Sequence, residues 1–265
     1  MIAAAIASAA CAVAVVLLVR AERQEDRRGR HRWKPLASAA FVALPLIAGA
    51  FAADRDRALA AWIVAGLVLG AIGDVALMFD SERSFLGGLV AFLLGHVAYM
   101  IGLAHVQPPG AWLDGAMVVA APLALVIALV VLAWLWPRLG AMRGPVIAYV
   151  LVISTMLIGG LAVSLTGGAA SATTRHLLTA GAALFFASDL AVAREKFIGR
   201  DPWNRTIGLP VYYAAQVLFA WALVVACGLG AAPSPRAATW RASRAPCGAC
   251  GCGRGRASST RPSWP

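Results

Sequence analysis

The stretch "GLVLGAIGDVALMFD", residues 66–80, is almost entirely apolar, yet it carries an aspartate at position 74, six residues before the charged Asp80. An apolar run of this length and composition predicts part of a membrane-spanning helix. An ionised carboxylate inside a bilayer costs roughly 2.5–3.5 kcal/mol on insertion scales, and such residues are rare and mostly functional. Asp74 is therefore the first candidate site residue.

The whole chain has the composition of a membrane protein. Hydrophobic residues make up 61% of it and charged residues only 13%, more apolar surface than a soluble domain of this size can bury. Long Ala, Leu and Val runs with internal glycines predict helices rather than barrel strands, which alternate apolar and polar residues. We predict an all-α, polytopic bundle of about eight transmembrane helices. The expected spans are 2–19, 36–53, 58–79, 85–106, 113–136, 145–166, 176–193 and 207–230.

The two ends of the chain differ in character. The first apolar segment has no positive residues before it, so we expect a retained helix rather than a cleaved signal peptide. Residues 1–231 form the predicted transmembrane domain, and residues 232–265 form a Gly-, Arg- and Ser-rich tail that we expect to be disordered. Its Cys247, Cys250 and Cys252 follow the spacing C-x-x-C-x-C, but without a visible fourth ligand they do not indicate a metal or redox site.

The loops predict the orientation of the chain. With eight spans, the odd-numbered loops carry fourteen Lys and Arg residues, seven of them within residues 20–34, whereas the even-numbered loops carry three. The positive-inside rule places the odd-numbered loops in the cytoplasm. The net charge of +11 is thus explained by topology, and no nucleic-acid partner is predicted. We expect an integral protein of a bacterial inner membrane.

Polar residues within the predicted spans gather toward the cytoplasmic leaflet. Asp74 lies about 9 Å from the charged end of its span, and Asp189 about 7.5 Å from Arg194, at about 1.5 Å per residue. The other polar residues toward this side are Lys34, Tyr149, Ser188, Tyr212 and Gln216, with His96 deeper. We interpret this cluster as a functional site. Two alternatives stay open: each aspartate bonds two helices together, or Asp74, His96 and Asp189 bind a metal ion.

One helical face leads to the first aspartate. Gly66, Gly70 and Asp74 recur every four residues, so they share a face of one helix. A stripe of small residues lets a neighbouring helix approach closely. We also expect a lipid chain to lie along this stripe.

Several motifs together resemble a known family. They are "KPL" (34–36), "GDVALMF" (73–79), the F-x-x-x-H-x-x-Y of Phe92, His96 and Tyr99, "GPVIAYVLVISTM" (144–156), "GAALFFASDLAVAREKF" (181–197) and "YYAAQVL" (212–218). In this order they resemble the YhhN-like integral membrane proteins, which include the lysoplasmalogenases. The resemblance implies an eight-helix enzyme that hydrolyses the vinyl ether bond of lysoplasmalogens, giving a fatty aldehyde and glycerophosphocholine or glycerophosphoethanolamine. It also places the family's two aspartates on Asp74 and Asp189. Val211, where the family often has threonine, and the cysteine-arginine tail depart from the pattern.

The chemistry of a vinyl ether suits two carboxyl groups. This bond resists nucleophiles but is hydrolysed by acid, which needs one carboxylic acid and one carboxylate. We expect Asp74 and Asp189 to divide these roles, without assigning which is the acid, and no metal or cofactor is required. The predicted substrate-binding residues are Lys34 and Arg194 for the phosphate, Tyr149, Ser188, Tyr212 and Gln216 for water or glycerol oxygens, and His96. The expected partner is a lysophospholipid within the bilayer.

A rival function uses the same residues. Paired intramembrane acids are also typical of proton-coupled transporters. Against that reading, the sequence has no pair of Pro- or Gly-broken helices at corresponding midplane positions, and the acids lie toward one surface. A non-catalytic membrane scaffold would leave the polar cluster unexplained. Product release by the purified protein distinguishes an enzyme from a transporter.

Overall fold

The structure of the chain is a computed structural model that describes residues 1–51, 57–167, 170–199 and 201–226. Helices make up most of these residues, and no strand occurs among them. The helices are α1 (Ile2–Arg23), α2 (Arg27–Ile47), α3 (Arg57–Ala76), α4 (Glu82–Val106), η1 (Pro109–Ala111), α5 (Met117–Leu135), η2 (Trp136–Arg138), η3 (Gly140–Met142), α6 (Arg143–Leu165), α7 (Ala172–Phe197) and α8 (Pro202–Ala226). The predicted all-α bundle of about eight long helices is confirmed. The predicted tail, residues 232–265 with its three cysteines, lies outside the described residues.

Helix α2 differs from its predicted span. Within the described residues, seven helices are long and apolar enough to cross a membrane, and α2 is not one of them. It begins at Arg27 rather than 36, because the Asp26 side chain accepts a hydrogen bond from the Arg28 N–H (3.0 Å) and caps the helix. It ends at Ile47 rather than 53. The first two turns of α2 are therefore charged, and the apolar part is short.

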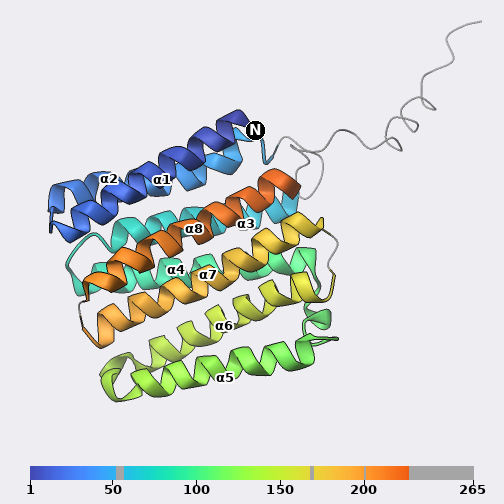
Figure 1. The fold of residues 1–265 in the computed structure, drawn as a ribbon. Coiled ribbons are helices and arrows are strands. Elements are labelled where there is room, and N and C mark those ends of the chain that lie inside the picture. The colour runs from blue at the N-terminus through green and yellow to red at the C-terminus, as the bar shows by residue number, and fades with distance from the viewer. Residues whose placement is uncertain (52–56, 168–169, 200, 227–265) are drawn as a thin grey trace, which may run out of the picture. The chain divides into compact units, whose positions relative to one another are not determined.

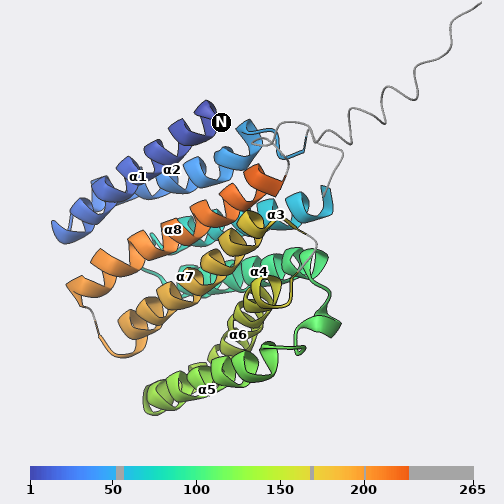
Figure 2. The same ribbon diagram turned by 45° about the vertical axis from the view of Figure 1, so that its right-hand side comes forward.

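The helices pack as neighbouring antiparallel pairs with α8 at their centre. Helix α8 packs against α7 and also against α1, α2 and α3. Helix α6 lies between α7 and α5 and also contacts α4, while α5 packs chiefly on α6 at one side of the bundle (Figure 1; Figure 2). This order brings α2, α3, α7 and α8 together, the four helices that carry most of the predicted site residues.

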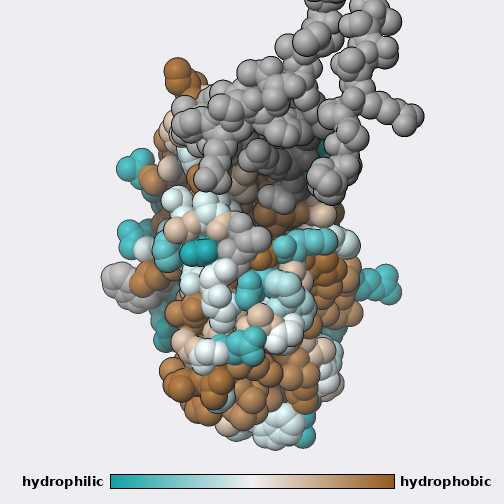
Figure 3. Space-filling view, turned by 90° about the vertical axis from the view of Figure 1, so that its right-hand side faces the viewer, coloured by the Kyte–Doolittle hydropathy of each residue, from teal (hydrophilic) through white to brown (hydrophobic). Residues whose placement is uncertain are grey.

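The outer surface of the bundle is apolar. On α5, Val118, Val119 and Leu123 expose 58–72% of their surface. Apolar side chains gather over the lower side of the bundle, where α5 lies, while polar side chains lie across the middle of the end that faces the viewer (Figure 3). Because exposed apolar area of this extent is unfavourable in water but not in lipid, the chain is an integral membrane protein.

The glycine stripe of α3 is filled by neighbouring side chains. A Cβ at Gly66 would overlap with the Tyr99 ring of α4, and one at Gly70 would overlap with the Gln216 amide of α8. The close approach of neighbouring helices is thus as expected. The expectation that a lipid chain lies along this stripe is wrong, because protein side chains occupy it.

Candidate active site

A cavity of about 730 Å³ lies at one end of the bundle. Most residues that line it belong to the end formed by the starts of α2, α4, α6 and α8 and the ends of α1, α3, α5 and α7, and it reaches inward to Phe92, Ala128 and Ile153. Six of the predicted site residues line it: Lys34, Asp74, Tyr149, Ser188, Asp189 and Tyr212. The other three, His96, Arg194 and Gln216, are not part of its wall. The two aspartates therefore face one cavity from α3 and α7.

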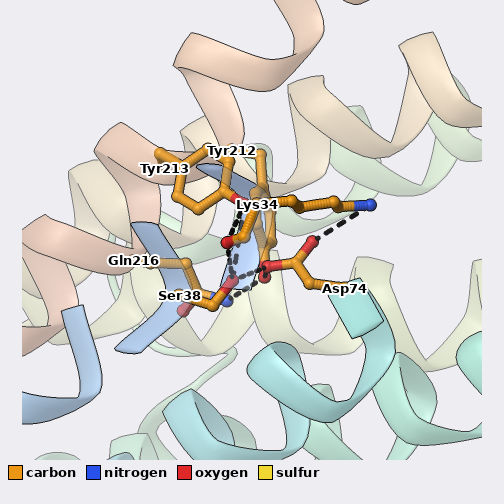
Figure 4. Close-up of polar contacts among 6 residues, drawn as sticks. All are labelled: Lys34, Ser38, Asp74, Tyr212, Tyr213 and Gln216. Atoms are coloured by element: carbon orange, nitrogen blue, oxygen red, sulfur yellow. Dashed lines mark hydrogen bonds and ion pairs between the residues drawn. The ribbon is translucent and has the colours of Figure 1, made fainter. Parts of the chain in front are cut away.

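Asp74 is almost fully buried, forms an ion pair with one side chain and accepts hydrogen bonds from two others. The Lys34 Nζ lies 3.6 Å from its Oδ1, and Ser38 Oγ and Tyr212 Oη donate to its Oδ2 at 2.6 and 2.9 Å (Figure 4). These donors come from α2 and α8, which pack on each other and on α3. An ionised carboxylate only accepts hydrogen bonds, so the arrangement meets the needs of an anion with a cation beside it.

A further row of polar groups sets the orientation of Tyr212. The Gln216 Nε2 donates to the Tyr212 hydroxyl at 3.0 Å, and the Tyr99 hydroxyl donates to Gln216 Oε1. Because Tyr212 accepts from Gln216, its own proton is left to donate to Asp74 (Figure 4). Gln216 thus contacts Tyr212 but does not line the cavity. Its predicted contact with substrate does not fit this position.

Ser38 is the site residue that the sequence analysis missed. It is buried, donates to Asp74, and lies 3.4 Å from the Tyr213 hydroxyl, which itself donates to the Lys34 carbonyl oxygen at 3.4 Å. The signal was present in the sequence, because Ser38 follows Lys34 by four residues and so shares its face of α2.

Asp189 has different partners from Asp74. The Tyr149 hydroxyl of α6 donates to its Oδ2 at 2.7 Å, and the His96 Nε2 of α4 lies 3.4 Å from the same oxygen. The neighbouring Ser188 donates to the Phe185 carbonyl oxygen at 2.8 Å, within its own helix. Asp189 is thus held by a phenol and an imidazole, whereas Asp74 is held by an ammonium group and two hydroxyls.

His96 is enclosed behind Asp189. Its ring is fully buried, with the Tyr149 and Phe185 ring centroids 5.4 and 4.5 Å away. Its Nδ1 lies 2.6 Å from the Phe92 carbonyl oxygen, one turn earlier in α4. Since His96 does not line the cavity, it reaches the site through Asp189, and its predicted contact with substrate does not fit this position.

Aromatic rings stand between the two aspartate clusters. The Tyr212 ring, which belongs to the Asp74 cluster, lies edge-on to Phe92 (5.7 Å) and to Phe185 (5.4 Å). Phe185 in turn contacts His96 of the Asp189 cluster. Aromatic faces attract cations, and Phe92 and Tyr212 also line the cavity, so its wall suits a positive charge.

Arg194 has its partners at the turn between α7 and α8. Its guanidinium lies 2.9 Å from Asp201 Oδ2 and donates to Asn204 Oδ1 at 3.0 Å. Its predicted contact with a phosphate is not supported by this position, because the cavity wall does not include it. The cations on that wall are Lys34, Arg30 and Lys196.

The structure does not support the alternative that Asp74, His96 and Asp189 bind a metal ion. Among the residues that the structure describes, no group of three or more His, Cys, Asp or Glu side chains is placed to hold a metal ion. Asp74, His96 and Asp189 do not form such a group.

Comparison with known proteins places the chain in a family. The model of the YhhN family matches residues 29–223, which include all nine predicted site residues. The chain belongs to the YhhN family. This YhhN chain is 34% identical over 163 residues to the lysoplasmalogenase TMEM86A of Bos taurus and to that of Homo sapiens, and 31% identical over 160 residues to the lysoplasmalogenase TMEM86B of Rattus norvegicus. The alignments cover 61% of the chain and 65% of each TMEM86A protein, and 59% of the chain and 59% of the TMEM86B protein. No solved structure matches significantly.

Proposed function

We propose that this chain is a membrane-embedded hydrolase that cleaves the vinyl ether bond of lysoplasmalogens, with Asp74 and Asp189 as its acid and base. The observation that carries the proposal is that two carboxyl groups with different partners, Asp74 buried and Asp189 partly buried, line one cavity. The relatives named lysoplasmalogenase support the substrate class. No step of this chemistry needs a metal or a cofactor.

The volume and lining of the cavity suit a single-chain lipid. Its volume is within the usual range for small-molecule sites, about 300–1,000 Å³. One part of the wall is apolar and comes from α4, α5 and α6, with Leu89, Ala128, Val131, Val150 and Ile153. This apolar arm accommodates the hydrocarbon chain, and the polar residues at the end of the bundle remain for the head group.

Two of the three cations on the wall are available to the phosphate of the head group, because the third, Lys196, lies over the Phe85 ring at 3.9 Å from its centroid. Lys34 Nζ is held near Asp74 Oδ1 at 3.6 Å, and the Arg30 Nη1 lies 3.7 Å from Glu22 Oε2. Both contacts are longer than a direct hydrogen bond, so each cation keeps donors for a phosphate oxygen. We assign Lys34 and Arg30 to the phosphate in place of Arg194, whose guanidinium binds Asp201 and Asn204.

The reaction follows the acid-catalysed route. A carboxylic acid protonates the β-carbon of the vinyl ether, which leaves an oxocarbenium ion. A carboxylate takes a proton from water as the water oxygen bonds to the α-carbon. The hemiacetal then releases the glyceryl alcohol and the aldehyde. The aromatic rings of Phe92 and Tyr212 line the cavity beside Asp74, where the cation forms.

The site faces the cytoplasmic leaflet in this proposal. The cavity lies at the end of the bundle where α1, α3, α5 and α7 end, which is the end of the odd-numbered loops. These loops carry fourteen of the Lys and Arg residues, against three in the even-numbered loops. A lysolipid in that leaflet would place its head group at the polar mouth.

The test is aldehyde release by the detergent-purified protein from an alkenyl lysophospholipid, beside its saturated alkyl ether analogue. Release from the alkenyl lipid alone is expected, and Asp74→Asn and Asp189→Asn should fold yet lose turnover. Release from neither lipid by folded protein would reject the proposal. The transporter alternative would then be supported by substrate flux into vesicles that Asp74→Asn abolishes. Hydrolysis retained in both variants would reject the acid–base assignment.

A further inference from the structure

We propose that His96 and Asp189 share one proton and act together as the acid, while Asp74 stays ionised as the base. This inference rests on the proposed function and adds the division of roles that the sequence left open. Asp189 would touch the substrate as a catalytic residue, and His96, which does not reach the cavity, would be a positioning residue that acts through it.

The backbone of α4 determines the tautomer of His96. Its Nδ1 lies 2.6 Å from the Phe92 carbonyl oxygen, and a carbonyl oxygen only accepts hydrogen bonds. The Nδ1 therefore carries a hydrogen. In a neutral imidazole the Nε2 then presents a lone pair, and this atom has no hydrogen-bond partner among the described residues.

The lone pair on His96 Nε2 implies that a proton lies between this atom and Asp189. The charged atom that faces this Nε2 is Asp189 Oδ2, 3.4 Å away. A lone pair facing a carboxylate oxygen in a buried site is repulsive, whereas one proton between the two atoms makes the contact attractive. The proton completes either a carboxylic acid beside a neutral imidazole or an imidazolium beside a carboxylate. The separation exceeds an ordinary hydrogen bond, and we expect it to shorten when substrate binds.

Asp74 shows the opposite arrangement. Its Oδ2 already accepts from Ser38 and Tyr212, and its Oδ1 faces the Lys34 ammonium group. A proton on Oδ1 would meet the Lys34 ammonium group, which cannot accept a hydrogen bond, and a proton on Oδ2 would require Ser38 or Tyr212 to turn its own hydrogen away from Asp74. The contrast between the two clusters, and not the burial of either acid, assigns the proton to Asp189.

The proton count closes over one turnover. The His96–Asp189 pair gives its proton to the β-carbon, and Asp74 takes a proton from the water that adds to the α-carbon. When the hemiacetal breaks down, Asp74 gives that proton to the leaving glyceryl oxygen. The hemiacetal hydroxyl gives its proton to Asp189 as the aldehyde C=O forms. Both aspartates are restored, and the net reaction consumes one water molecule.

The proton can be located without any substrate. The chain has four histidines, so ¹⁵N-histidine labelling gives a small set of ring signals that His96→Gln assigns by loss of one set. We expect the His96 ring to carry its hydrogen on Nδ1, and its Nε2 signal to move in Asp189→Asn. Infrared spectra should show a carboxylic acid C=O band, or an imidazolium signal in its place, that Asp189→Asn removes and Asp74→Asn keeps. A hydrogen on Nε2 alone, or loss of the band in Asp74→Asn only, would overturn the assignment.

Kinetics give the second readout. His96→Gln preserves a side-chain donor toward Asp189 but cannot pass a proton, so we expect kcat to fall by roughly 10²-fold with KM nearly unchanged. His105→Gln is the matched control, because this histidine lies on the same helix and is exposed. An equal kcat for the two variants would overturn the role of His96. If the spectra are as expected but no lipid is hydrolysed, the proposed function fails and the shared proton stands.

Discussion

Gly70→Ala adds a single methyl group at the point where α3 meets the residues that orient Tyr212. A Cβ at position 70 would overlap with Gln216 Nε2 and lie 3.1 Å from the Tyr212 hydroxyl. Gln216 is fully buried and bonded on both sides, to Tyr99 and to Tyr212. It therefore has to give up one of these hydrogen bonds to make room.

The size of the effect follows from these contacts. Overpacking a core, or leaving one buried polar group unpaired, costs about 1–3 kcal/mol. For a domain of this size that corresponds to a fall in Tm of roughly 2–12 °C. If the same free energy is lost from the transition state, because Tyr212 no longer donates correctly to Asp74, turnover falls about 5- to 150-fold.

Gly87→Ala is the matched control for this prediction. Gly87 lies in α4 with no neighbouring atom within 4 Å of a built Cβ, so alanine there gains helix propensity, about 1 kcal/mol, without a clash. The two measurements are Tm by thermal unfolding in detergent and the rate of aldehyde release from an alkenyl lysolipid. Both should fall in Gly70→Ala, whereas in Gly87→Ala both should equal or exceed those of the unmodified protein. A Gly70→Ala protein as stable and as active as Gly87→Ala would refute the packing of Gln216 against α3.

Three further changes test other parts of the site. Tyr212→Phe removes the 2.9 Å hydrogen bond to Asp74 and the acceptor of Gln216, so it should lower kcat by about 5- to 150-fold in steady-state assays and lower Tm by roughly 2–12 °C. Lys34→Met leaves a buried carboxylate without its cation, which costs about 3–5 kcal/mol, so its Tm should fall and should recover when Asp74→Asn is added; no recovery would argue against the ion pair. Ala128→Trp narrows the apolar arm and should slow long-chain lysolipids more than short-chain ones, whereas Leu129→Trp, which faces outward, should do neither.

The end of the bundle that holds the site could be predicted from the sequence. A helix rises by a fixed distance per residue, so the depths of Asp74 and Asp189 followed from their separation from charged residues. The order of basic loops put both depths on the same side. The cavity that both aspartates line agrees with this reasoning.

Which individual side chains point into the cavity was harder to predict. Gln216 and His96 lie in the expected helices at the expected depths, but they bond to Tyr212 and approach Asp189 from behind rather than lining the cavity. Which face of a helix meets a cavity depends on how each helix is rotated against its neighbours, and a chain that is apolar all round carries little periodicity to show it. Arg194 was misjudged for a related reason, because its partner Asp201 follows a turn whose geometry the sequence does not fix.

The start of α2 differed because hydropathy and helix formation are separate properties. A window of apolar residues began at 36, whereas the capping bond from Asp26 begins the helix within the basic run. The earlier start places Arg30 and Lys34 on helical turns beside the cavity.

The proposed reaction protonates the β-carbon of a vinyl ether and adds water to the α-carbon. It is tested most directly by turnover of an alkenyl lysophospholipid in D₂O, and separately in H₂¹⁸O, with the aldehyde trapped as it forms and both products analysed by mass spectrometry. We expect one deuterium at carbon 2 of the aldehyde, and ¹⁸O in the aldehyde but not in the glyceryl alcohol. An aldehyde without deuterium at carbon 2, or ¹⁸O in the glyceryl alcohol, would contradict it.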